Sequence, residues 1–172
     1  MNDPSPRPAL PRSVAVRKLA AHGQDLGGVI GGAALLRLAE AVSAIEGPVA
    51  VQLHFEPGTS GIPEVHGTVS ARVAMICQRC LGDLTVLLEV PVALGVVRDG
   101  AEEQGLPGRL DPWIVPDEDG DLHELAEDEL LLALPIVALH DDTSCHAAPA
   151  AGGDDDDTAS PFRVLADLKP QR

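Results

Sequence analysis

The stretch 64-EVHGTVSARVAMICQRCLGDLTVLLEVPVALGVV-97 contains two long apolar segments, 64–76 and 84–97, on either side of a short turn. β-Branched and aliphatic residues dominate both segments, which is typical of strands, and the Gly-Asp pair between them favours a turn. The sequence therefore predicts two antiparallel strands joined in a hairpin. Cys77 and Cys80 lie at the tip of that hairpin.

The residues that precede this hairpin predict one helix and one further strand. Apolar residues in 33–45 recur at helical spacing, and the Gly-Pro pair that follows ends a helix. Residues 49–55 alternate between apolar and polar, as in a half-buried strand. The segment 13–20 alternates in part and could form an edge strand, and the glycines of 27–32 are interpreted as a flexible linker.

The residues that follow the hairpin predict an acidic loop and a second helix. Residues 98–120 are rich in acids and turn formers, with one apolar group at 113–115. The segment 121–134 has leucines at helical spacing, and Asp121 can accept hydrogen bonds from the first turn as its cap. Glu127, Asp128 and Glu129 are expected on the outer side of this helix. Residues 136–140 are expected to be extended.

These elements predict an α+β protein in which a bent antiparallel sheet, built from 49–97, is packed by two main helices at 33–45 and 122–134. The 172 residues fit a single domain of ordinary size. The expected organisation is a flexible arm at 1–12, the domain at 13–146, an acidic linker at 147–160 and a short docking segment at 161–172.

Charge and cysteine content limit the possible functions. The formal net charge is −15, and such a protein is a poor non-specific ligand for nucleic acid but a good one for basic partners. No apolar run approaches the roughly 20 residues of a membrane span. Three cysteines, an odd number, fit a reducing compartment, so we expect a cytoplasmic protein.

The C-x-x-C at the hairpin tip has three interpretations. A redox dithiol is the least favoured, because both flanks are strands and no helix N-terminus activates the thiols. A structural zinc site needs four ligands, which Cys77, Cys80 and Cys145 could supply together with either His140 or His146. In the third interpretation the cysteines are small apolar residues at a tight turn.

Four motifs resemble a known family. They are 77-CQRCL-81, 127-EDELLLALPIVALH-140, Cys145 and 161-PFRVLADLK-169. In this order they are similar to the YceD-like proteins of bacteria and plastids, which are described as large ribosomal RNA subunit accumulation proteins. This chain has Ala138 where that family usually has a second proline.

The resemblance implies a non-enzymatic factor that supports accumulation of large-subunit ribosomal RNA and biogenesis of the large subunit. No small-molecule substrate is expected. In one version, the partner is a ribosomal protein or assembly factor bound by acidic residues. These are Asp117, Asp119, Asp121, Glu127 and Asp128. In another, the partner is ribosomal RNA, bound by Arg79 with Arg12, Arg17, Lys18 and Arg72. The competing hypothesis is a zinc- or thiol-dependent enzyme that uses the C-x-x-C, although no common catalytic motif is present.

Overall fold

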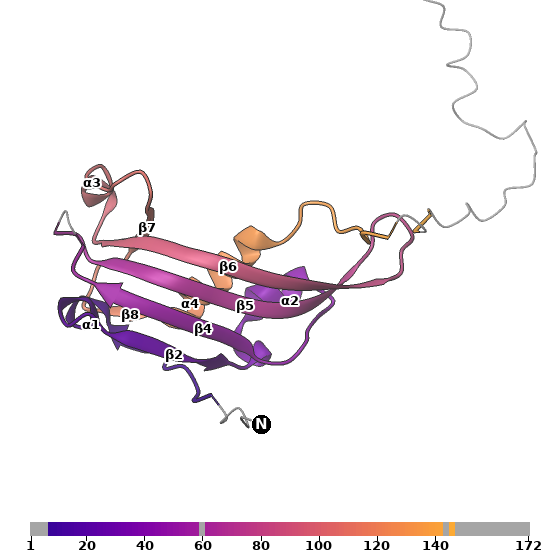
Figure 1. The fold of residues 1–172 in the computed structure, drawn as a ribbon, viewed down its shortest axis with the longest axis horizontal. Helices are drawn as coiled ribbons and strands as arrows, with labels where there is room; N and C mark the ends of the chain where they lie inside the picture. Colours follow the sequence, from indigo (N-terminus) through magenta and orange to yellow (C-terminus); the bar gives the residue numbers. More distant parts are fainter. Residues whose placement is uncertain (1–6, 59–60, 143–144, 147–172) are drawn as a thin grey trace, which may run out of the picture.

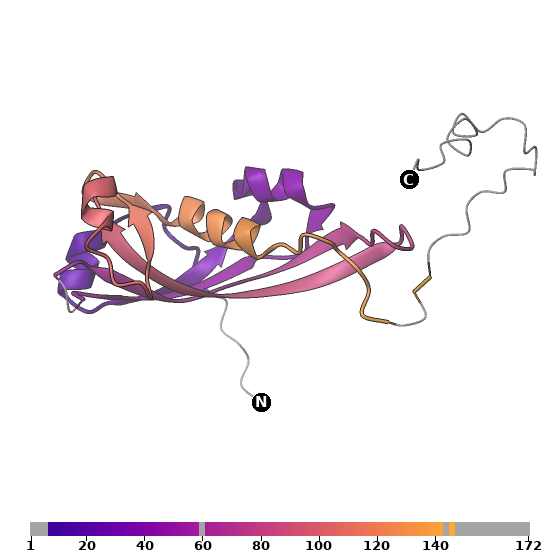
Figure 2. The ribbon, with the colours of Figure 1, turned by 90° about the horizontal axis from the view of Figure 1, so that it is seen from above.

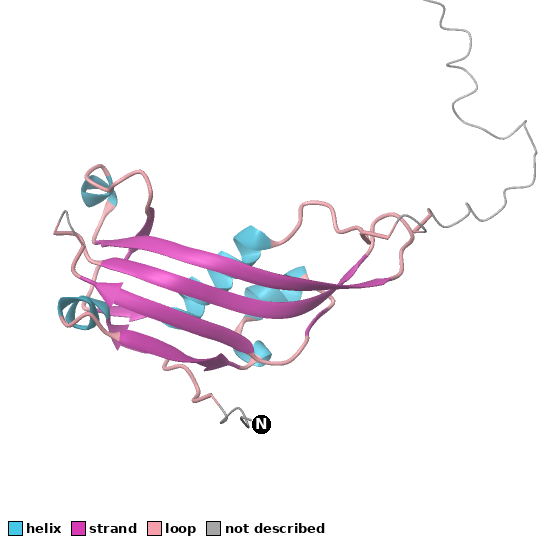
Figure 3. Ribbon diagram, in the orientation of Figure 1, coloured by secondary structure: helices cyan, strands magenta, loops and turns pink. Residues whose placement is uncertain are grey.

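The computed structural model describes residues 7–58, 61–142 and 145–146, which form a sheet and several short helices (Figures 1 and 3). In chain order the elements are β1 (Ser13–Ala15), α1 (Val16–Ala21), β2 (Asp25–Ile30), the 3-10 helix η1 (Gly32–Ala34), α2 (Leu36–Ala41), β3 (Ala44–Ile45), β4 (Val49–Glu56), β5 (Glu64–Ile76), β6 (Asp83–Val97), α3 (Gly100–Glu103), β7 (Asp111–Ile114), β8 (Asp119–Asp121) and α4 (Leu122–Ala133). The α+β class predicted from the sequence is confirmed.

The main sheet has six strands in the order β2-β4-β5-β6-β7, with β3 paired beside β5. The predicted hairpin is its centre, since β5 and β6 pair without interruption from Glu64↔Gly95 to Ile76↔Asp83. On one side of the hairpin, β4 pairs antiparallel with β5, and β2 pairs antiparallel with β4. On the other side, β7 runs parallel to β6. The antiparallel pairing predicted for 49–97 is confirmed, but the expectation of a loop over 98–120 is wrong where β7 forms this parallel edge. A parallel neighbour requires a crossover, and the residues between Val97 and Asp111 supply it.

Helices α2 and α4 both lie on one face of the sheet (Figure 2). Valines of the strands alternate toward that face, and Val51, Val69 and Val73 are fully buried in the same core cluster as Leu38 and Leu130. With no tyrosine and few other aromatics, aliphatic packing provides the core. At roughly 1.5–3 kcal/mol for each fully buried aliphatic side chain, this packing is the main stabilising term.

The glycine-rich stretch before the first helix is a strand, β2, and not the predicted linker. A close backbone approach explains one of its glycines, Gly28. The backbone of residues 8–10 runs beside it, with the Leu10 N–H donating to the Val29 carbonyl at 2.9 Å. A Cβ on Gly28 would lie 2.8 Å from the Pro8 carbonyl oxygen. Leu10 enters the core with 4% exposure, so the predicted flexible arm does not extend over residues 8–10.

Two elements are shorter than the sequence predicts. They are the helix expected at 33–45 and the edge strand expected at 13–20. Helix α2 ends at Ala41 because the chain that follows it pairs with β5. The Ser43 N–H donates to the Ala74 carbonyl at 2.8 Å. At the N-terminus only β1 is extended, and α1 follows it directly. Tertiary pairing has overridden local periodicity in both places.

Helix α4 confirms the second predicted helix. Asp121 is its N-cap, and its Oδ1 accepts hydrogen bonds from the N–H groups of His123 and Glu124 at 2.9 and 3.0 Å. Residues 136–140, expected to be extended, form no regular strand. Within the described ranges, no helix is long and apolar enough to cross a membrane.

Candidate metal centre at the hairpin tip

The C-x-x-C forms a compact turn at the end of the β5–β6 hairpin. The Cys77 N–H donates to the Gly82 carbonyl, and the Leu81 N–H donates to the Cys77 carbonyl, both at 2.9 Å. Leu81 has a φ of 60°, the left-handed region that leucine rarely adopts. Such strain persists only where the surroundings enforce it and is common at functional sites.

The segment that follows α4 is tied across this tip by three hydrogen bonds. The Gln78 N–H donates to the Ala138 carbonyl at 2.8 Å. Arg79 Nη1 donates to the Cys145 carbonyl at 3.1 Å. His140 Nε2 donates to the Asp83 carbonyl at 2.8 Å. These bonds bring the later cysteine and histidine to the first two cysteines.

Four side chains meet as a result, and their ligand atoms all lie within 4.8 Å of one another: Cys77, Cys80, Cys145 and His140. The sulfurs of Cys77 and Cys145 are 3.7 Å apart. His140 Nδ1 lies 3.4 Å from the Cys80 sulfur and 3.5 Å from the Cys145 sulfur.

This spacing matches a tetrahedral zinc site. With Zn–S of about 2.3 Å and Zn–N of about 2.0–2.1 Å, tetrahedral angles separate two sulfurs by about 3.8 Å and a sulfur from a nitrogen by about 3.5–3.6 Å. The observed separations agree closely with these values. These are three of the six separations among the donors, and the other three are at most 4.8 Å, so the four groups could hold a metal ion.

The orientation of His140 supports the same chemistry. A carbonyl oxygen only accepts hydrogen bonds, so the contact to Asp83 places a proton on Nε2. In the neutral imidazole, Nδ1 then presents its lone pair to the sulfurs. A backbone carbonyl that fixes the tautomer in this way is the usual outer partner of a metal-binding histidine.

The electrostatics of the cluster favour one thiolate. The backbone N–H of Cys80, with those of Arg79 and His140, lowers the pKa of Cys77 to about 5 against the opposing effect of burial. Burial, reinforced by Cys80 and Cys77, raises the pKa of Cys145 to about 11. A metal cation would stabilise the thiolate form of every sulfur in the cluster.

Of the two histidines proposed as the fourth ligand, the structure brings only His140 to the sulfurs. His146 is exposed and lies outside the cluster. The sequence alone could not choose between them. The choice depends on the hydrogen bond to Asp83 and on the course of the chain beyond α4.

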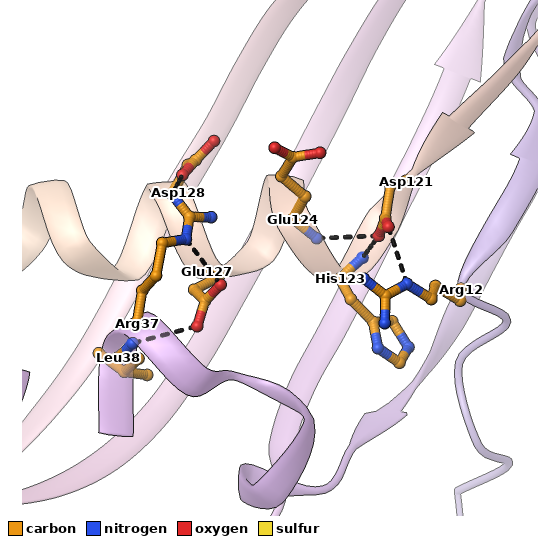
Figure 4. A network of polar contacts seen from close by, with 8 residues as sticks. All are labelled: Arg12, Arg37, Leu38, Asp121, His123, Glu124, Glu127 and Asp128. Carbon is orange, nitrogen blue, oxygen red and sulfur yellow. Dashed lines mark hydrogen bonds and ion pairs between the residues drawn. The ribbon is translucent and has the colours of Figure 1, made fainter. Parts of the chain in front are cut away.

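The acidic residues predicted to bind a partner differ in their surroundings (Figure 4). Glu127 is 7% exposed, and its carboxylate accepts hydrogen bonds from the Leu38 N–H and from Arg37 Nε, both at 3.0 Å. The expectation that it lies on the outer side of the helix is wrong, because it faces α2. Asp128 is exposed and pairs with Arg37 at 2.6 Å, and Asp121 pairs with Arg12 at 2.8 Å.

The N-terminal bases proposed to contact RNA are engaged by the acidic segment that precedes α4. Arg17 donates to the carbonyls of Asp117 and Val115 at 2.8 and 3.1 Å, and Lys18 pairs with Glu118. Asp117 and Asp119 themselves are exposed.

A second cluster, which sequence reasoning missed, lies at the opposite end of the hairpin. Glu56, Glu64 and His66 approach one another closely enough for a metal. Arg109 already pairs with both carboxylate oxygens of Glu64 at 2.8 and 2.9 Å and lowers the pKa of that carboxyl. We therefore assign this cluster to an ion-pair network.

Comparison with known proteins decides the family. The family model "Large ribosomal RNA subunit accumulation protein YceD" matches residues 65–169. The chain belongs to the YceD family. It is 32% identical over 168 residues to the Haemophilus influenzae protein of that name, an alignment that covers 93% of this chain and 96% of the relative. No solved structure matches the chain significantly.

The region that matches the YceD family contains the whole candidate metal centre. It begins in β5, at the base of the central hairpin, and continues through α4 to residue 169. The strands and helices that position the four side chains therefore lie almost entirely within the family's own domain.

Proposed function

We propose that the protein supports accumulation of large-subunit ribosomal RNA, and hence biogenesis of the large ribosomal subunit, as a factor without catalytic activity. The observation that carries this proposal is the alignment to the Haemophilus influenzae relative, which runs over nearly the full length of both chains. A shared activity needs a shared fold and surface, and an alignment of this extent leaves little of either chain outside the comparison.

Within this function, a basic ribosomal protein or assembly factor is the favoured direct partner. The formal net charge of −15 favours encounter with basic surfaces. Asp117 and Asp119 have exposed side chains on the segment before α4. The alternative, direct RNA contact, is less favoured because Arg12, Arg17 and Lys18 already bind acids or carbonyls of the same chain. Of the two remaining candidates, Arg79 holds the Cys145 carbonyl, and Arg72 is exposed on β5.

The metal ion proposed for the hairpin tip is zinc in a structural role. When bound, zinc would link the C-x-x-C turn to the segment that follows α4. The donor set, three sulfurs and one imidazole nitrogen, is one that structural zinc sites use. The distances among the donors and the tautomer of His140 support this assignment.

The burial of Cys77 disfavours the competing hypothesis of a thiol-dependent enzyme. Cys77, the cysteine with the lowered pKa, is fully buried, so a substrate could not reach its sulfur. Its thiolate character is what a metal ligand requires. All three sulfurs also face one another and His140, which suits a closed four-ligand site.

Complementation tests the proposed function. The gene of the relative would be deleted in Haemophilus influenzae and replaced by the gene of this chain, and the ratio of large- to small-subunit ribosomal RNA would be measured. We expect deletion to lower the ratio and this chain to restore it. A ratio that stays low despite normal amounts of the folded protein contradicts the proposal.

Charge reversal identifies the partner in the same cells. Asp117→Lys with Asp119→Lys should release a co-purifying basic protein, and nuclease treatment should not. The matched control reverses two exposed acids around α2, Glu40→Lys with Glu46→Lys, and should retain that protein. Loss of all partners on nuclease treatment would instead favour direct RNA binding.

A further inference from the structure

A groove with an apolar floor runs between α4 and β7. It has a volume of about 470 Å³. Its floor includes the buried side chains of Leu94 and Leu125 and the half-buried Trp113. Leu132, on the same side of α4, is 82% exposed. A leucine this exposed beside an indole ring is apolar surface available for burial.

The rim of this groove is acidic. Asp111, Asp128 and Glu129 all border it. Burial, with repulsion from Asp111 and then Asp128, raises the pKa of Glu129. Arg37 pairs with Asp128, but the ion pairs among the described residues include neither Asp111 nor Glu129. The groove therefore suits an occupant that is apolar on one side and carries positive charge.

The C-terminal segment of the chain has this chemistry. Residues 161-PFRVLADLKPQR-172 lie outside the described part of the structure, and their sequence contains Phe162, Val164, Leu165 and Leu168. Three bases, Arg163, Lys169 and Arg172, outweigh the single acid Asp167. In a chain with a net charge of −15, a terminal segment that is apolar and basic is complementary to the body that precedes it.

The extent of the family match and the length of the linker 147–160 are both compatible with a groove occupied by residues 161–172 of the same molecule. The match continues to residue 169 and so includes most of this segment. The fourteen residues 147–160 connect it to His146 and can span at most about 46–50 Å. Helix α4, which lies between the hairpin tip and β7 (Figure 2), has 12 residues and a length of about 18 Å. The connection can therefore span the length of α4 more than twice.

We propose that residues 161–172 dock into the α4–β7 groove of the same chain, with their aliphatic and aromatic side chains on its floor and their bases at its acidic rim. The docked segment would cover Trp113 and the exposed Leu132. It would also place a positive charge beside Glu129. The proposal does not depend on the ribosomal role and can fail or succeed independently of it.

The single tryptophan of the chain provides the first test, since Trp113 lies in the groove and no tyrosine interferes. In the full-length protein, Phe162→Asp with Leu165→Asp should shift the tryptophan emission to the red and increase its quenching by acrylamide. The matched control places the same acids in the linker, Ala150→Asp with Ala159→Asp, and should leave both unchanged. Emission and quenching that are identical in the two variants would overturn the proposal.

Photo-crosslinking locates the docked segment. Benzoylphenylalanine at position 162 should crosslink to residues of α4 or β7 within one chain, as peptide mass spectrometry would show. The yield should fall in Leu132→Asp and persist in Leu36→Asp, a change at a similarly exposed leucine of α2. Crosslinks to another part of the chain, crosslinks only between two copies, or no crosslinks at all would each overturn intramolecular docking.

Discussion

The two ends of the central hairpin are held together by different forces. Toward the body, β5 contributes Val65, Val69 and Val73, all fully buried against aliphatic neighbours. Toward the tip, the same strand ends in Ile76, which is 45% exposed, and Leu81 in the turn is 69% exposed. The hydrophobic effect thus stabilises one end, and sulfur, imidazole and backbone polar groups organise the other.

This difference implies that the body and the tip unfold separately. The body is a continuous core between the sheet and helices α1, α2 and α4, and cores of this kind melt cooperatively. The tip has few apolar contacts of its own, and local unfolding favours such regions. A change in the body should therefore lower the free energy of global unfolding, whereas a change at the tip should alter only local opening.

The largest expected effect is that of Leu130→Ala in α4. Leu130 is fully buried in the core, and its truncation should lower the free energy of unfolding by about 3–5 kcal/mol. Urea denaturation followed by circular dichroism would measure this change. Leu36→Ala, at a 69% exposed position of α2, is the control and should cost about 0.5 kcal/mol or less. Equal losses in the two variants would contradict the assigned core face of α4.

A smaller but substantial effect is expected for Glu127→Ala. The change leaves the buried Leu38 N–H without its acceptor and should cost about 2–3 kcal/mol. Asp128→Ala removes an exposed partner of the same Arg37, so its melting temperature should stay close to that of the parent protein. If Glu127→Ala instead melts normally but loses a binding partner, the sequence-based assignment of Glu127 to the interacting surface would be supported.

Some of this architecture could be predicted from the sequence because its causes are local. The β5–β6 hairpin follows from strand composition around a Gly-Asp turn, and α4 follows from leucine spacing and the cap at Asp121. The candidate ligands could be selected because sulfur and imidazole are few in this chain. Periodicity and composition carried the necessary information in each case.

The rest could not be predicted because its causes are tertiary. Gly28 of β2 is explained only by the neighbouring backbone of residues 8–10, which no local pattern reveals. Glu127 resembles its exposed neighbours in sequence, and only the position of α2 makes it a buried acceptor. The parallel pairing of β7 depends on a crossover whose direction no strand pattern contains.

At the tip, Leu81→Gly should have a modest stabilising effect. Glycine adopts a positive φ without the steric cost that leucine incurs, a difference of about 1 kcal/mol or a fivefold change in local opening. Hydrogen exchange of the amides of 77–82 should slow accordingly, while the global melting temperature stays constant. Faster exchange in the glycine variant would show that the Leu81 side chain itself stabilises the turn.

Metal removal should have the smallest effect on global unfolding. If zinc joins the turn to the segment that follows α4, a chelator or Cys80→Ser should abolish zinc binding as measured by elemental analysis. Amide exchange should then accelerate in 77–82 and 138–140. The body should keep its free energy of unfolding to within about 0.5 kcal/mol, because it shares no buried side chain with the four ligands.

The control for this last experiment is His146→Ala, because His146 lies beside the cluster but outside it and should leave zinc binding intact. Collapse of the whole sheet after chelation would contradict the separation of body and tip. It would mean that the β5–β6 ladder transmits the loss of the metal along its full length. Of the three cysteine ligands only Cys77 is fully buried, and its side chain is not part of the aliphatic core. The separation of body and tip rests on this difference.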